Sequence, residues 1–234
     1  MPTDALLPRE TGQWMEDADG LRWWFDSGAL ALDFAYTGGA EVLGGVEGTD
    51  HDGADHDTAD GDTADHGTQW RSVDDAEQLG AWLQSRFPEV AATTGDREFR
   101  DAEMLRAAIG RLARQASRGE TLGPADVDVV NLFAATPDIP PVLSGGGRQA
   151  GRTLARPHQA LGTVARDAVR LFGPDADGRI RECSADDCGL VYLDTSRSGN
   201  RRWCSMQRCG NRAKVRAHRA RAAGRRAGAA EIAE

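Results

Sequence analysis

The sequence predicts a mainly α-helical (α+β) protein, in which a helical N-terminal domain with a small hairpin or sheet precedes a treble-clef-like four-cysteine zinc finger. Three observations predict this class. Apolar residues recur at spacings of three and four along much of residues 1–172, as they do in helices with one buried face. All four cysteines fall within a C-terminal stretch of 27 residues. The charge also divides, because residues 1–178 carry a formal charge of −16 and residues 179–234 one of +7.

Composition excludes several classes of protein. The chain has 234 residues, a length that suits one large domain or a medium domain with a small module. Hydrophobic residues make up 40% of it, which is enough for a core and excludes a wholly disordered chain. No stretch approaches about 18 consecutive apolar residues, the length of a membrane-spanning helix. The first 20 residues lack a basic start followed by an apolar run, so we expect no secretory signal and a cytoplasmic protein.

The pattern of apolar residues does not decide the secondary structure at the start of the N-terminal domain. Residues 21–37 begin with an aromatic patch and continue into an apolar stripe, for which helix and short strand are both open. Residues 47–66 hold eight carboxylates, no basic side chain and almost no apolar bulk. Such a segment cannot bury enough surface to offset the entropy of ordering it, so we expect a disordered acidic insertion. This insertion could fold back on the basic C-terminal segment as a mimic of DNA.

Four helices are predicted in the rest of the N-terminal domain, separated by proline and glycine. The first is capped by Ser72 or Asp74 and ends at Pro88, the second covers 96–118, the third runs from Pro124 to Pro137, and the fourth runs from Pro157 to Gly173-Pro174. The glycine-rich residues 140–157, which lead into the last helix, favour a loose hairpin.

Residues 1–172 contain no pattern that is typical of catalysis. They have no glycine-rich phosphate loop, no nucleophile elbow, no HExxH and no cysteine. Asp33 is interpreted as a cap or a buried hydrogen-bond partner, and His158 as an ordinary residue of a first helical turn. Five tryptophans are expected in the core, with an apolar ligand pocket as the alternative: Trp14, Trp23, Trp24, Trp70 and Trp82. We therefore expect a protein that is not an enzyme.

The four cysteines predict one structural zinc ion. Cys183 and Cys188 form one close pair, Cys204 and Cys209 form another, and 15 residues separate the pairs, which suits four thiolates around a single Zn²⁺. Disulfides would need an oxidising compartment, and an iron–sulfur cluster is a further alternative. Four cysteine ligands leave no open coordination position, so the zinc is structural rather than catalytic. Because so short a segment has little core, we expect chelation to unfold the finger and to spare the N-terminal helices.

The residues around this site predict a hairpin followed by a helix. Between Cys188 and Cys204 the sequence is typical of strand, turn and strand, with residues 198–200 at the tip. Helix-forming residues continue from the second pair to about Ala223. A knuckle, a hairpin and a helix in this order indicate a treble-clef-like finger.

The basic C-terminal segment predicts binding of duplex DNA. From Arg201 to Arg226 there are ten basic residues and no carboxylate. A rigid helix with arginine stripes can neutralise several phosphates, and arginine or asparagine can read base edges, as Asn211 could read adenine. The expected nucleic-acid contacts are Arg201, Arg202, Arg208, Asn211, Arg212, Lys214, Arg216, Arg219 and Arg221. At helical spacing the basic residues form two stripes, one with Arg208, Arg212, Arg216 and Arg219 and one with Lys214, Arg221 and Arg225. The alternative is a solvated charged helix whose arginines reflect a GC-rich genome.

Residues 179–221, which include the run RRWCSM at 201–206, resemble the CGNR zinc finger, named for the run from Cys209 to Arg212. The resemblance implies that the four cysteines bind zinc and that the basic residues contact DNA. Proteins of this family usually carry an ABATE-type N-terminal domain and are described as stress-induced transcription regulators. Residues 30–39, LALDFAYTGG, resemble the opening of that domain, although Tyr36 stands where Asn is common and the acidic insertion departs from the pattern.

The expected function is that of a bacterial, nucleoid-associated DNA-binding regulator whose N-terminal domain senses a small-molecule ligand or forms a homodimer, with no membrane partner. The alternative is an adaptor whose finger binds RNA or an acidic protein surface. The expected organisation is a flexible N-terminus (1–20), an ABATE-like domain (21–172), a linker (173–178), the zinc finger (179–223) and a flexible tail (224–234).

Overall fold

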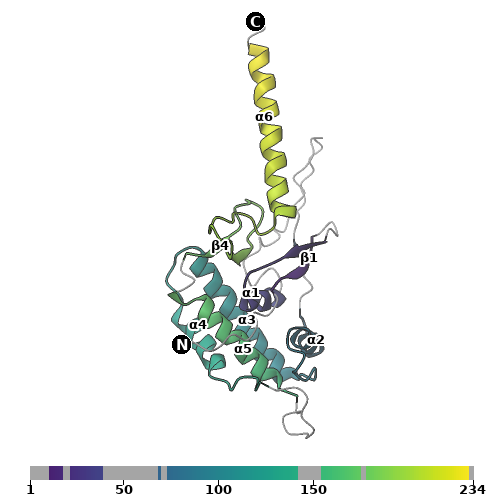
Figure 1. Cartoon of the computed structure of the whole chain (residues 1–234), viewed down its shortest axis with the longest axis vertical. Coiled ribbons are helices and arrows are strands. Elements are labelled where there is room, and N and C mark those ends of the chain that lie inside the picture. The colour runs from purple at the N-terminus through teal and green to yellow at the C-terminus, as the bar shows by residue number, and fades with distance from the viewer. Residues whose placement is uncertain are drawn as a thin grey trace, which may run out of the picture.

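Helices form most of the part of the chain that the structure describes, as the sequence predicts for a mainly α-helical protein. The structure is a computed structural model, and it describes residues 11–17, 22–38, 68–69, 73–141, 154–174 and 178–231. Its elements are, in order, β1 (Gln13–Asp17), β2 (Arg22–Phe25), α1 (Leu30–Ala35), the 3₁₀ turn η1 (Tyr36–Gly38), β3 (Thr68–Gln69), α2 (Ala76–Arg86), α3 (Asp96–Ser117), α4 (Pro124–Ala134), α5 (Pro157–Leu171), β4 (Ile180–Glu182), β5 (Val191–Leu193), the π-helical turn η4 (Met206–Gly210) and α6 (Asn211–Glu231) (Figure 1). Among the described helices, none has the length and apolar character needed to cross a membrane.

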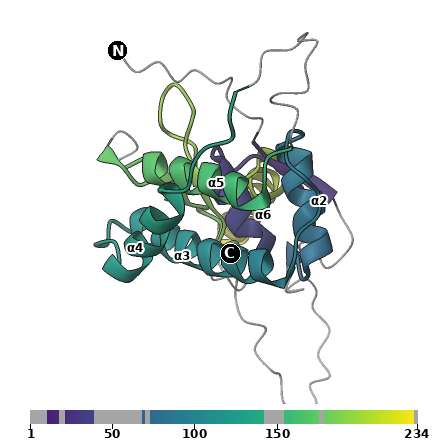
Figure 2. The same ribbon diagram turned by 90° about the horizontal axis from the view of Figure 1, so that it is seen from below.

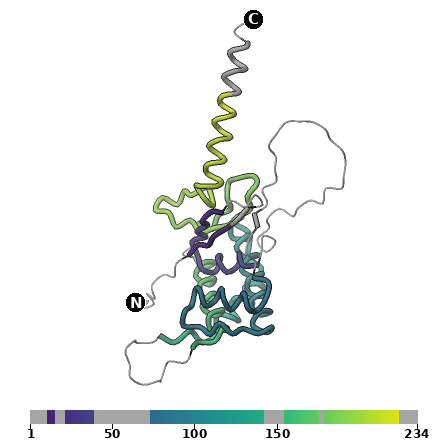
Figure 3. The backbone as a smooth tube through the Cα atoms, turned by 90° about the vertical axis from the view of Figure 1, so that its right-hand side faces the viewer, coloured from purple at the N-terminus to yellow at the C-terminus, as the bar shows by residue number. Residues whose placement is uncertain are grey.

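The helical part of the protein is organised around α3. This helix packs against α1, α4 and α5, and α2 lies at one end of the group (Figure 2). Its buried face carries Leu105, Ile109 and Leu112 at the spacing that predicted a helix over residues 96–118. All six residues of α1 are buried, because this short helix lies between the helical group and the small sheet (Figure 3). The prolines at the first positions of α4 and α5 begin these helices as expected.

The N-terminal cap of α2 differs from the prediction. The cap is Asp75, whose carboxylate accepts a hydrogen bond from the backbone N–H of Gln78 at 2.8 Å. The Gln78 side chain donates to the Asp75 carboxylate at 3.0 Å and accepts from the backbone N–H of Asp74, four residues earlier, at 3.0 Å. A cap side chain bonds to a backbone N–H two or three residues later, and Asp75 with Gln78 satisfies that spacing. The predicted cap Asp74 is therefore wrong, and the other predicted cap, Ser72, lies outside the described residues.

Residues 21–37, for which strand and helix were both open, contain both. β2 covers Arg22–Phe25, and α1 begins at Leu30 after a break at Ser27 and Gly28. Most of the predicted hairpin at 140–157 lies outside the described residues, as do the acidic insertion at 47–66, residues 1–10 of the predicted flexible N-terminus (1–20) and residues 232–234 of the predicted flexible tail (224–234). Within the described part of these two ends, Gln13–Asp17 forms β1 and α6 continues to Glu231. In the described part of 140–157, Ala155 forms a parallel bridge with Val90.

The three-stranded sheet has the order β2-β1-β3 and alternates between a buried and an exposed face. Met15, Trp23 and Phe25 point into the core, whereas the cross-strand pair Trp14 and Trp24 is 58% and 44% exposed. The prediction of a tryptophan core is therefore wrong for this pair, since residues on adjacent positions of a strand face opposite sides. Trp82 packs half-buried against the core, and Trp70 lies outside the described residues.

Asp33 on α1 is fully buried and joins α1 to the start of β1. Its carboxylate accepts hydrogen bonds from the Ser27 hydroxyl at 2.6 Å and from the backbone N–H of Gly12 at 2.7 Å. The Arg86 guanidinium lies 3.6 Å away and donates to the Gly12 carbonyl at 2.6 Å. Burial raises the pKa of Asp33 to about 6, and the hydrogen bonds and Arg86 oppose this only in part. Asp33 is thus a buried hydrogen-bond partner, one of the two interpretations that the sequence left open.

This raised pKa predicts that Asp33 makes the fold more stable as the pH falls. The unfolded carboxyl titrates near 3.8 and the folded one near 6, so the folded state binds the proton more tightly. The free energy of unfolding should rise by about 0.8 kcal/mol through this group between about pH 7.5 and about pH 5.5. Urea unfolding of the native chain and of Asp33→Asn at both pH values measures it, since the variant should lack this increment. Equal pH dependence of the two proteins would contradict the assignment.

Candidate metal centre and basic helix

The first cysteine pair sits on a knuckle between two strands. β4 and β5 pair antiparallel, with Ile180 opposite Leu193 and Glu182 opposite Val191. At the end of β4 the backbone N–H of Cys183 bonds to the Leu190 carbonyl at 2.8 Å, and the N–H of Cys188 bonds to the Ala185 carbonyl at 3.0 Å. These bonds fold the four intervening residues into a tight turn that aims both sulfurs at one point.

This pairing corrects the predicted hairpin. β5 pairs with β4, which precedes the first cysteine, and residues 194–203 form no strand. The buried carboxylate of Asp194 explains the difference. It accepts from the backbone N–H and hydroxyl of Ser196 at 3.0 and 2.5 Å and from the N–H of Arg201 at 2.9 Å. These bonds use backbone donors that a second strand would need and close the segment into a loop.

The second cysteine pair sits on a wide helical turn. Cys204 precedes the π-helical turn Met206–Gly210, and Cys209 lies within it. The backbone N–H of Gly210 bonds to the carbonyl of Ser205, five residues earlier, at 3.0 Å. A wide turn therefore brings two sulfurs five positions apart to the same side, and α6 continues from it at Asn211.

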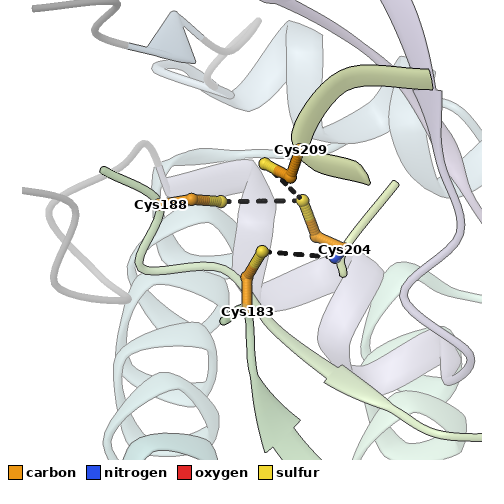
Figure 4. Close-up of side chains that lie close together, drawn as sticks. All are labelled: Cys183, Cys188, Cys204 and Cys209. Carbon is orange, nitrogen blue, oxygen red and sulfur yellow. Dashed lines mark hydrogen bonds between the residues drawn. The ribbon is translucent and has the colours of Figure 1, made fainter. Parts of the chain in front are cut away.

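The four sulfurs converge on one buried point (Figure 4). All four lie within 4.8 Å of one another, with Cys188 and Cys204 3.6 Å apart and Cys204 and Cys209 3.5 Å apart. Four thiolates about 2.3 Å from a tetrahedral zinc stand about 3.8 Å from each other, so the donor set fits Zn²⁺. The distances exclude a disulfide within either of these two pairs. No other cluster of metal-ligating side chains occurs in the described ranges.

Arg212 supports the site from outside the ligand set. Its guanidinium donates to the Cys209 sulfur at 3.3 Å. Hydrogen bonds from the neighbouring cysteines and from Arg212 lower the pKa of the Cys209 thiol, which favours the thiolate form that binds metal. Four thiolates and one Zn²⁺ carry a net charge of −2, and Arg212 offsets part of it. The basic pattern of the sequence predicts a nucleic-acid contact for Arg212 and not this role, although the position of Arg212 three residues after Cys209 on a helix is a usable signal for it.

Two of the arginines predicted to contact nucleic acid hold the finger against the N-terminal sheet. Arg208 is only 4% exposed, and its guanidinium stacks 4.3 Å from the centre of the Trp23 ring. Arg201 lies 4.2 Å from the centre of the Tyr192 ring and donates to the carbonyls of Asp26 and Cys204. A planar guanidinium can both stack and donate, which explains arginine at these positions. In this arrangement the Arg208 side chain does not reach solvent.

The other predicted contacts lie on α6 and beside it. Arg212 and Arg216 each approach the carboxylate of Asp187, in the knuckle, at 2.9 Å. The Asn211 amide donates to the Gln207 carbonyl at 3.1 Å, and Arg202 is exposed beside the Trp203 ring. Besides Arg216, three further cationic side chains are exposed on the described part of α6: Lys214, Arg219 and Arg221. α6 extends away from the body of the protein (Figure 1).

The finger shares one hydrophobic core with the N-terminal helices, which the sequence did not reveal. The buried Tyr36 hydroxyl donates to the Val191 carbonyl and accepts from the Val191 N–H, both at 2.7 Å. Burial raises the pKa of Tyr36 well above its ordinary value. The N–H of Leu193 bonds to the Ser27 carbonyl at 2.8 Å, and a Cβ at Gly28, whose φ is +80°, would lie 2.6 Å from the Leu193 carbonyl. Only glycine therefore fits this contact.

Comparison with known protein families gives two matches. The ABATE model, described as "Putative stress-induced transcription regulator", matches residues 28–174. The model described as "CGNR zinc finger" matches residues 179–222 and contains all four cysteines. The first model begins after β2 and spans α1 to α5, and the second begins one residue before β4. No curated protein matches the chain.

Proposed function

Because the chain belongs to the ABATE family and carries a CGNR zinc finger, we propose that it is a zinc-dependent DNA-binding protein that regulates transcription, as the family description suggests, in response to stress. One observation carries this proposal. A tetrathiolate site fixes the first turn of α6, and the following two turns project cationic side chains into solvent. An α-helix of this kind fits the major groove of duplex DNA, and its cations can replace condensed counterions.

The N-terminal domain would set when or where the finger binds. A cavity of about 230 Å³ lies where α3 and α5 end against the start of β4. Leu122, Leu171, Phe172 and Ile180 contribute apolar side chains to a mixed lining, and Glu120 adds a carboxylate. A small ligand there would touch both matched domains, which supports a sensing role; homodimerisation through this domain is the other candidate.

We propose no catalytic role, because the four thiolates close the coordination sphere of the metal. A regulator of this kind would work on the bacterial nucleoid in the cytoplasm.

Selection from a random duplex library tests the proposed function. The zinc-loaded full chain should enrich a reproducible sequence motif, and its affinity for that motif should fall as salt rises. A parallel selection from random single-stranded RNA at the same salt is the matched comparison. Tight capture of RNA without any duplex motif would contradict the proposal and favour the adaptor.

A further inference from the structure

The two basic stripes of α6 have different surroundings, and this difference assigns them different roles. We infer that the face of α6 with Lys214, His218 and Arg221 enters the major groove of duplex DNA, whereas the face with Arg212 and Arg216 anchors the helix to the zinc knuckle. The inference rests on the proposed function and makes it specific, because it selects one of the two stripes as the binding surface.

Helix geometry separates the two faces. Successive residues of an α-helix are rotated by about 100°, so Arg212 and Arg216, four apart, lie on one side. Lys214, His218 and Arg221 follow one another at spacings of four and three and form a second row. The middle of this row is about 180° from the middle of the first by the same rotation. A duplex that contacts one row closely therefore cannot contact the other in the same way.

The first row is already engaged with the finger. Arg212 and Arg216 both pair with Asp187, and Arg212 also donates to the Cys209 sulfur. Their side chains are 23% and 56% exposed. A phosphate reaching either guanidinium would have to compete with a carboxylate 2.9 Å away, and it would meet the negative charge of Asp187 itself. Asp187 thus connects the knuckle to the second turn of α6 and sets the direction of the helix.

The second row is available to a polyanion. Lys214, His218 and Arg221 are all exposed, and within the part of the chain that the structure describes no carboxylate lies within ion-pair distance of Lys214 or Arg221. Cations that contact phosphates, with the His218 imidazole between them along the helix, are suited to a major groove. An exposed α-helix enters the wide major groove of B-form DNA but not the deep, narrow major groove of A-form RNA, so the inference commits to duplex DNA as the occupant.

Two single variants with the same change in charge test the inference. Arg221→Gln neutralises a cation on the proposed DNA face, and Arg219→Gln neutralises an exposed cation on the side of Arg212 and Arg216 without removing either of these anchors. Zinc content and melting temperature are measured first, to show that both variants fold. Affinity for the selected duplex is then measured by fluorescence anisotropy over a range of salt concentrations. Arg221→Gln should lose at least about fivefold in affinity and about one unit of salt slope, whereas Arg219→Gln should lose less than about twofold.

The possible failures are distinguishable. If the anchoring-side variant loses as much affinity as the other or more, the assignment of the face is wrong while the proposed function stands. If the native zinc-loaded chain binds duplex no better than it binds RNA, the proposed function fails, and the assignment fails with it.

Discussion

Replacing Cys204 with serine is expected to abolish tight zinc binding and to unfold more than the finger. Cys204 lies between Cys188 and Cys209 in the cluster, and structural zinc contributes about 10–16 kcal/mol of apparent binding free energy in small fingers. Because the finger shares its core with α1 and β2, loss of the metal should also remove the partners of Tyr36 and Trp23. This changes the expectation from sequence that the N-terminal helices are spared.

Hydrogen exchange with zinc analysis measures this effect. In Cys204→Ser, amide protection should fall in β4, β5, β2 and α1, while α4, on the far side of α3, keeps most of its protection (Figure 1). Ser205→Ala, a change at the neighbouring position, should bind one zinc per chain and keep the native pattern. A Cys204→Ser protein that retains stoichiometric zinc would contradict the assignment of Cys204 as a ligand, and one that loses protection in the finger alone would contradict the shared core.

Replacing Tyr36 with phenylalanine is expected to lower the free energy of unfolding by about 2 kcal/mol, because it leaves both backbone polar groups of Val191 buried without their partner. The loss of stability should appear in the zinc-loaded protein. Zinc should also dissociate faster from the variant, because Val191 belongs to β5, which follows the first cysteine pair. Tyr192→Phe is the matched control. It removes the same atom but only one hydrogen bond, to the Arg201 carbonyl, so its cost should be about 1 kcal/mol. Urea unfolding compares them, and an equal or smaller loss for Tyr36→Phe would contradict the role of this contact.

The sequence was sufficient for the helices and for the metal site, because both depend on local spacing. Three signals can be recognised without tertiary structure. They are the prolines at the starts of α4 and α5, the apolar residues spaced three and four apart along α3, and the two cysteine pairs. The zinc ligands follow from the same logic, since a knuckle and a helical turn each need only a few residues to aim two sulfurs.

The roles of the basic residues and the pairing of the finger strands could not be predicted, because they depend on distant partners. Arg208 has the same spacing as an exposed helical arginine, but Trp23, some 185 positions earlier, covers it. β5 pairs with β4 rather than with residues 194–203 because Asp194 captures backbone donors in that loop. Tyr36 had no polar signal in the sequence, since its partner is a backbone group of β5.

Zinc should hold α6 in the orientation that binds DNA, and the duplex affinity of the Cys204→Ser variant tests this most directly. Native and Ser205→Ala proteins are the references, all measured on the selected duplex at one salt concentration. We expect the variant to lose at least about a hundredfold in affinity, because phosphate contacts spread over a fixed helix provide most of it. A metal-free variant that binds within about threefold of the native protein would contradict the claim.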